Sequence, residues 1–231
     1  MANKPFYPTN REDVYFVAPI PILKKEYGND VITQRVYDLG NRLLDPEGKL
    51  QGQELPGQYD KIRQDHYHIN YDYQEEWTES HELPPLGSRY YAKPNDFLST
   101  ENEDVEVIKR RIINGFKQLI GDKNCDPVIT ENWMQYYHPA DGRGHNAHNH
   151  NRWSNNEEKP LMFSGGYYLS DGNPIKDHPY SGTFAFHIRG ERHYIRPKAG
   201  MLMMWPHDLL HSVAPFYGET YRTVINFNIE V

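Results

Sequence analysis

The sequence contains a single cysteine, Cys125, among its 231 residues. One thiol cannot form a disulfide within the chain, and nothing beside it in the sequence is expected to lower its pKa and make it a reactive nucleophile. Reduced thiols are typical of the cytosol, and the N-terminus has no basic start followed by an apolar run, as a secretory signal would. We therefore expect a cytoplasmic protein.

Long apolar runs and an excess of positive charge are also missing. No stretch approaches the roughly 18 unbroken apolar residues of a membrane span, so we expect a soluble chain with no membrane partner. The formal net charge is −7 and the isoelectric point is near 5.9. This charge argues against a protein-wide grip on nucleic acid phosphates. A protein or small-molecule partner is the remaining expectation, with the oligomeric state left open.

The length predicts one domain spanning 1–231. Residues 1–127 contain a strand, helices and long loops, with 46–100 polar and without sustained periodicity. From residue 128 onward, short β-prone runs alternate with turn residues. The predicted strands are Asn132–His138, Met162–Leu169, Thr183–Ile188, Met201–Trp205 and Arg222–Glu230.

Three elements are predicted before residue 128. Val14–Ile22 is interpreted as one edge strand, because prolines interrupt it. Apolar residues recur at helical spacing over 31–45, with Asp30 as the N-cap. A second helix is predicted to begin after Thr100 or Asn102 and to end at Gly121.

Histidines provide the strongest chemical signal, since nine of the twelve lie between His138 and His211. His148 and His150 are two residues apart, so in an extended segment their side chains point to the same side and can reach one ion. His211 follows an apolar strand and is the best third ligand. Three imidazoles suit iron, zinc, copper or nickel.

Arg222 opens the last predicted strand, eleven residues after His211. An arginine facing into a barrel is costly unless it meets an anion, and its planar fork fits a carboxylate. The sequence therefore suggests an acidic cosubstrate.

The order of these residues resembles the iron(II)- and 2-oxoglutarate-dependent oxygenases, in particular the prolyl hydroxylase branch and a group of small oxygenases of bacteria and phages. The resemblance covers about residues 128–231. It rests on Tyr137-His-Pro-Ala-Asp-Gly-Arg-Gly-His-Asn-Ala-His148-Asn-His150, Gly166-Tyr167-Tyr168-Leu169, Gly200 with Trp205-Pro206, His211-Ser-Val-Ala-Pro and Arg222.

The resemblance implies a mainly β (α+β) fold, a double-stranded β-helix (jelly-roll, cupin-like) core buttressed by N-terminal helices. It implies a hydroxylase that uses iron(II), 2-oxoglutarate and O2 on a C–H bond of a peptidyl or small-molecule substrate. His148 and His211 match iron ligands, and Arg222 matches the residue that binds the far carboxylate of 2-oxoglutarate. Tyr137 and Tyr168 match tyrosines that line the cosubstrate pocket.

His150 stands where most members of that family have aspartate. This exchange removes a negative charge from the metal, so metal binding is better supported than full hydroxylase turnover. Asp141 is an alternative carboxylate ligand. His66 and His68 repeat the His-x-His spacing, but no Gly-aromatic strand or distal histidine follows them, so we interpret them as a loop feature.

Two other functions remain open. The chain can be a cupin-type metalloenzyme that uses no 2-oxoglutarate, with Arg222 binding an acidic substrate directly. It can also be a non-catalytic module that binds a metal or another ligand in the same groove, because a fold does not determine a function.

Overall fold

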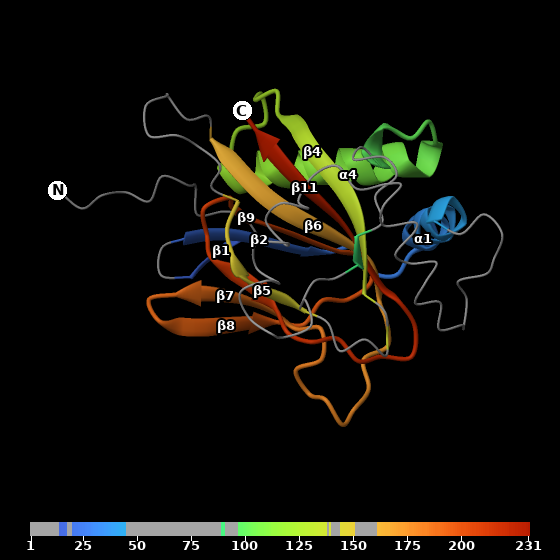
Figure 1. The fold of residues 1–231 in the computed structure, drawn as a ribbon. Helices are drawn as coiled ribbons and strands as arrows, with labels where there is room; N and C mark the ends of the chain where they lie inside the picture. The colour runs from blue at the N-terminus through green and yellow to red at the C-terminus, as the bar shows by residue number, and fades with distance from the viewer. Residues whose placement is uncertain are drawn as a thin grey trace, which may run out of the picture.

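The computed structural model describes residues 20–44, 97–137, 139, 144–150 and 161–231, with 14–17, 43–44 and 89–90 described by their backbone alone. These residues form two antiparallel sheets that face one another, with two α-helices beside the larger sheet (Figure 1). None of the described helices has the length and apolar character needed to span a bilayer.

The larger sheet has seven strands in the order β1-β2-β9-β6-β11-β4-β3. Its strands are β1 (Val14–Val17), β2 (Ile20–Glu26), β3 (Arg89–Tyr90), β4 (Val128–Tyr137), β6 (Met162–Asp171), β9 (Met201–Pro206) and β11 (Arg222–Glu230). The last strand of the chain, β11, lies between β6 and β4, so residues far apart in the sequence become neighbours at the centre of the sheet.

The smaller sheet has four strands in the order β5-β10-β7-β8. They are β5 (His145–His148), β7 (Phe184–Ile188), β8 (Glu191–Ile195) and β10 (His211–Val213). From β4 to β11 the chain passes repeatedly between the two facing antiparallel sheets. This arrangement confirms the expected double-stranded β-helix.

Each face of the larger sheet covers a separate core of buried side chains. Alternate residues of β11 divide between them: Phe227 and Ile229 pack toward the helices, whereas Val224 packs between the sheets. Side chains alternate across a strand, so each face collects every second residue. This explains why Met201–Trp205 is continuously apolar in sequence.

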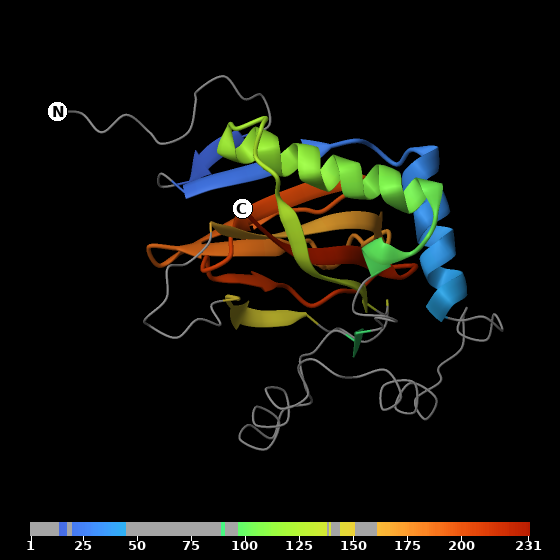
Figure 2. The ribbon, with the colours of Figure 1, turned by 90° about the horizontal axis from the view of Figure 1, so that it is seen from above.

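The two helices are α1 (Val31–Leu44) and α4 (Glu103–Ile120), and α4 crosses the outer face of the larger sheet (Figure 2). A short 3-10 turn, η1 (Phe97–Ser99), precedes α4. Helix α4 approaches the sheet closely at Gly115, where an added Cβ would lie 2.7 Å from Leu202 and 2.9 Å from Leu23. Apolar packing therefore holds α4, since each buried large apolar side chain contributes about 1.5–3 kcal/mol.

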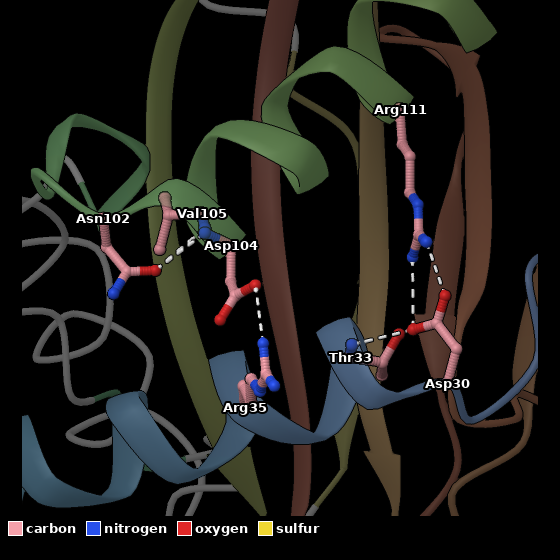
Figure 3. A network of polar contacts seen from close by, with 7 residues as sticks. All are labelled: Asp30, Thr33, Arg35, Asn102, Asp104, Val105 and Arg111. Carbon is pink, nitrogen blue, oxygen red and sulfur yellow. Dashed lines mark hydrogen bonds and ion pairs between the residues drawn. The ribbon is translucent and has the colours of Figure 1, made fainter.

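Polar contacts fix the helix ends. Asn102 caps α4 by accepting hydrogen bonds from the backbone of Asp104 and Val105, and Gly121 ends the helix in the left-handed conformation. Asp30 caps α1 by accepting from the backbone N–H of Thr33 at 2.8 Å (Figure 3). Both predicted caps are therefore confirmed.

Asp30 also joins the two helices. Arg111 of α4 donates to the Asp30 carboxylate at 2.5 Å and to the hydroxyl of Tyr167 in β6 at 2.6 Å (Figure 3 shows the ion pair). The Tyr167 hydroxyl lies 3.0 Å from that of Thr33. Burial raises the pKa of Asp30, but hydrogen bonds from Arg111 and Thr33 outweigh burial and lower it overall. The network links α1, α4 and the sheet at one point.

The structure differs from the predicted strands at three places. The predicted edge strand Val14–Ile22 is a hairpin of β1 and β2, and β2 is paired on both sides. Pro21 is tolerated because the pairing of β2 with β9 begins only at Leu23. Strand β4 begins at Val128, before the predicted Asn132, and the sequence did not predict β8, whose polar side chains are partly exposed.

We expect Asp30→Ala to lower the free energy of unfolding by about 2 kcal/mol, because it removes a helix cap and leaves the guanidinium of Arg111 without its carboxylate. Urea denaturation measures the loss. Asp38→Ala is the matched control, since Asp38 lies exposed on the same helix and bonds only to Gln34 among the described residues. Equal losses in the two variants would show that the network adds nothing to stability.

Candidate metal centre

Three histidines converge between the two sheets. His148 ends β5 and His211 begins β10, and the two residues are directly paired across these antiparallel strands, with ring centroids 4.4 Å apart. His150 lies two residues beyond β5, with its ring 5.4 Å from that of His148 and 5.1 Å from that of His211. One nitrogen of each ring lies within 4.8 Å of the others. In the described part of the chain, this is the single cluster of three or more residues arranged to hold a metal ion.

Backbone pairing explains why the rings meet. Side chains directly opposite one another on paired strands have their Cβ atoms about 4.5–5.5 Å apart, so pairing His148 with His211 places both imidazoles at one point. The chain after β5 is held by a backbone hydrogen bond of 2.9 Å from the N–H of His150 to the carbonyl of His207. All three predicted ligands are therefore brought together.

Backbone carbonyls orient two of the three rings. The Nδ1 atom of His148 lies 2.7 Å from the carbonyl oxygen of Asn146, and that of His211 lies 2.8 Å from the carbonyl oxygen of Leu209. A carbonyl oxygen only accepts hydrogen bonds, so each Nδ1 carries the proton. The Nε2 atoms are left with bare lone pairs, which is the form that binds metals.

Burial disfavours the protonated forms of His148 and His211. Burial lowers the pKa of His211 well below its ordinary value, and the neighbouring His148 and His150 lower it further. Burial also lowers the pKa of His148, against a smaller opposite effect of its hydrogen bond to Asn146. A metal therefore meets little competition from protons at neutral pH.

A fourth histidine, His145, lies beside the three, with its ring 4.8 Å from that of His148. Burial lowers the pKa of His145 strongly, and the charges of His148, His150 and Arg222 act in the same direction. Arg222 faces the same core as the histidines: Tyr137 and Tyr168 beside its guanidinium belong to the apolar cluster that contains Phe184, and the Phe184 ring stacks on His211. His145 was not among the predicted site residues, although it lies in the same histidine-rich segment of the sequence.

Arg222 is buried as the sequence predicts, with 2% of its surface exposed. Its Nε and Nη1 atoms have no hydrogen-bond partner in the described part of the chain. The Tyr137 and Tyr168 rings flank its guanidinium at 4.4 Å and 5.2 Å. A buried cation with free donors is costly, so this arrangement fits an anion that accepts from them.

Tyr168 remains a neutral phenol beside the guanidinium. Burial raises the pKa of Tyr168 to about 12, although the charge of Arg222 opposes this effect. Strand β6 is irregular here: its register with β11 shifts between Tyr168 and Ser170. Such a bulge re-aims side chains, and it brings Tyr168 beside the guanidinium.

Some predicted residues lie outside the described part of the chain. These are Asp141, the alternative carboxylate ligand, and the pair His66 and His68. The thiol of Cys125 lies at a distance from the histidines, in the core beneath the helices, and burial raises its pKa.

Three polar residues near the histidine cluster were not predicted from the sequence. Ser164 and Asn228 lie beside His150, and Glu131 lies behind Asn228. A signal existed for one of them: Asn228 shares its strand face with Arg222, because six residues separate them. Polar residues on a buried face of a strand indicate a site.

Comparisons with known proteins agree with this fold. No family model matches the sequence, and no curated protein matches it. Among solved structures, the chain is similar to EvdMO1 with a TM-score of 0.57 at 12% identity, covering 92% of this chain but about half (47%) of that one.

Two prolyl hydroxylases are similar over more than nine-tenths of their length. One is a prolyl-4-hydroxylase of Pseudomonas putida, with a TM-score of 0.52 at 14% identity over 92% of this chain and 94% of that chain. The other is a viral collagen prolyl hydroxylase from Paramecium Bursaria Chlorella virus-1, solved as a 2OG complex, with a TM-score of 0.53 at 14% identity over 91% and 96%. At this identity the likeness establishes the double-stranded β-helix fold.

The metal-free protein should lose stability as the pH falls through the ordinary histidine pKa of ~6.5. The folded-state pKa values of His145, His148 and His211 are lowered, so the unfolded chain binds protons that the folded chain does not. Their contribution to stability is complete above about pH 6.5 and is lost below it. Thermal unfolding between about pH 8 and about pH 5, in the presence of a chelator, measures this dependence.

The variant His145→Gln tests the assignment, because it removes one of these groups without touching the three ligands. It should flatten part of the dependence, whereas His178→Gln, at an exposed position, should leave the dependence unchanged. A thermal unfolding midpoint that stays constant down to about pH 5 would show that burial does not lower the pKa values of these histidines.

Proposed function

We propose that the chain is an iron(II)- and 2-oxoglutarate-dependent dioxygenase that hydroxylates a C–H bond of a peptidyl or small-molecule substrate. The observation that supports this proposal is that the histidine cluster and the buried Arg222 face the same core between the two sheets. One ring nitrogen from each of three imidazoles lies within 4.8 Å of the others, and Arg222, with two donors that have no partner among the described residues, is buried in the same core between the sheets.

The donor set fits iron(II). His148, His150 and His211 would hold the ion, because imidazole suits iron and three protein ligands leave positions for cosubstrate and O2. Iron and 2-oxoglutarate supply the oxidising chemistry when bound, with succinate and carbon dioxide as products. The protein contributes ligands already in the neutral form and a site enclosed between the sheets.

Arg222 and its neighbours fit the far carboxylate of 2-oxoglutarate. The Nε and Nη1 atoms of Arg222 are buried donors that a carboxylate can satisfy. Tyr137 and Tyr168 flank the guanidinium and exclude water from it. A free carboxylate at each end of the cosubstrate would thus meet a positive partner, the metal at one end and Arg222 at the other.

The substrate class follows the resemblance to prolyl hydroxylases. A peptidyl side chain is the first candidate, and a small molecule is the second. The metal-site residues do not themselves choose between the two, because substrate choice depends on residues outside the metal motif.

Arg222→Met should weaken 2-oxoglutarate binding by roughly 30-fold or more, equivalent to ~2 kcal/mol, because it removes the buried charge that the carboxylate would pair with. Isothermal titration of the iron(II)-loaded protein under anaerobic conditions measures the change. Arg192→Met is the matched control, since Arg192 lies exposed on β8.

If wild type and Arg222→Met bind 2-oxoglutarate equally poorly, the alternative of a cupin-type metalloenzyme replaces the proposal. If, in addition, anaerobic iron(II) with 2-oxoglutarate gives no visible charge-transfer band, the chain is a non-catalytic binding module.

Wild-type protein should release succinate slowly when supplied with iron(II), ascorbate, 2-oxoglutarate and O2, even without its substrate. His148→Ala and His211→Ala should reduce this release to the protein-free background, because each removes a metal ligand. His193→Ala, on β8 of the same sheet, should retain it. Succinate release that persists in both ligand variants would assign the activity to another source.

A further inference from the structure

A chain of polar contacts runs from a carboxylate to His150. The carboxylate of Glu131 in β4 accepts a hydrogen bond of 2.7 Å from the Nδ2 atom of Asn228 in β11. The Oδ1 atom of Asn228 lies 3.0 Å from the Nδ1 atom of His150. The hydroxyl of Ser164 in β6 donates to Asn228 Oδ1 at 2.8 Å and lies 2.9 Å from His150 Nδ1.

The carboxylate determines which way the Asn228 amide faces. An ionised carboxylate only accepts hydrogen bonds, so the amide nitrogen of Asn228 must point to Glu131. The amide oxygen then points to His150 and can only accept, which requires the proton of His150 to be on Nδ1. The Nε2 atom of His150 is consequently bare and available to a metal.

Without the carboxylate, the amide can rotate by 180° and present its nitrogen to His150. The nitrogen donates, so His150 Nδ1 would then have to accept and its proton would move to Nε2. Ser164 does not prevent this, since a hydroxyl both donates and accepts. An imidazole with its proton on Nε2 cannot bind a metal through that atom.

The tautomer of His150 depends on side-chain contacts, whereas the tautomers of His148 and His211 do not. The Nδ1 atoms of His148 and His211 face backbone carbonyls, which cannot exchange a donor for an acceptor. His150 instead faces side chains, and Asn228 and Ser164 are buried, at 6% and 0% exposure. Water is therefore poorly placed to replace the lost contacts.

We propose that Glu131 is a positioning residue for the metal: through Asn228 it fixes His150 in the tautomer that presents Nε2. It also places a negative charge two hydrogen bonds away from His150. His150 occupies the position where most of the oxygenases that the sequence resembles have an aspartate. The inference rests on the proposed metal site.

Glu131→Gln tests the proposal with almost no change of shape. The new amide can satisfy Asn228 in either orientation, so the tautomer of His150 is no longer fixed. Nitrogen-15 chemical shifts of the imidazoles, measured on metal-free protein at alkaline pH and assigned with His150→Asn, report the tautomer directly. We expect a mixed tautomer at His150, and iron(II) binding about tenfold weaker under anaerobic conditions.

A double variant provides the rescue. Combining Glu131→Gln with Asn228→Asp exchanges the two groups: the new carboxylate accepts from His150 Nδ1 in any orientation, and the new glutamine amide donates to it. This variant should recover the wild-type tautomer and most of the metal affinity. Glu230→Gln makes the same charge change two residues past Asn228 on β11 and should alter neither readout.

The proposal fails if Glu131→Gln keeps the wild-type tautomer, if it changes the tautomer without weakening metal binding, or if the double variant restores neither. A failure of the metal site itself is separately visible, because wild type would then bind no iron(II) while its tautomer would still be measurable in the metal-free protein.

Discussion

The antiparallel pairing of β5 with β10 is the constraint on which the rest of the site depends. It places His148 directly opposite His211, and the backbone bond from His150 to His207 then brings the third ring to the same point. A shift of this register by one residue would turn one of the paired imidazoles to the other face of the smaller sheet. The convergence of the three histidines therefore depends on strand register as much as on residue identity.

The two faces of the larger sheet have different roles. The outer face is apolar and carries α4, whose packing fixes the sheet from behind. The inner face collects polar residues along β11, with Arg222 at one end and Asn228 toward the other. Burying such groups costs free energy unless each finds a partner. Asn228 forms hydrogen bonds with Glu131 and His150. The Nε and Nη1 donors of Arg222 have no partner among the described residues and would suit an anionic ligand.

Much of this arrangement was predictable from the sequence, and the failures have physical causes. Periodicity and capping residues gave both helices, and the His-x-His spacing with His211 gave the metal cluster. The sequence did not predict β8, because an edge strand with exposed polar side chains has no apolar alternation. It did not predict the register shift in β6 beside Tyr168, since a bulge adds one residue without changing composition.

By itself, the sequence determined the chemistry that is available: imidazoles at a ligand spacing, one arginine in an apolar strand, and no carboxylate at the position of His150. Only the tertiary structure decided which side chains form hydrogen bonds with the Nδ1 atom of that histidine. Glu131 and Asn228 are 97 residues apart and meet because β4 and β11 are neighbours. The orientation of the Asn228 amide depends on the carboxylate that it faces. That carboxylate comes from a distant segment, so the orientation cannot be predicted from the local sequence.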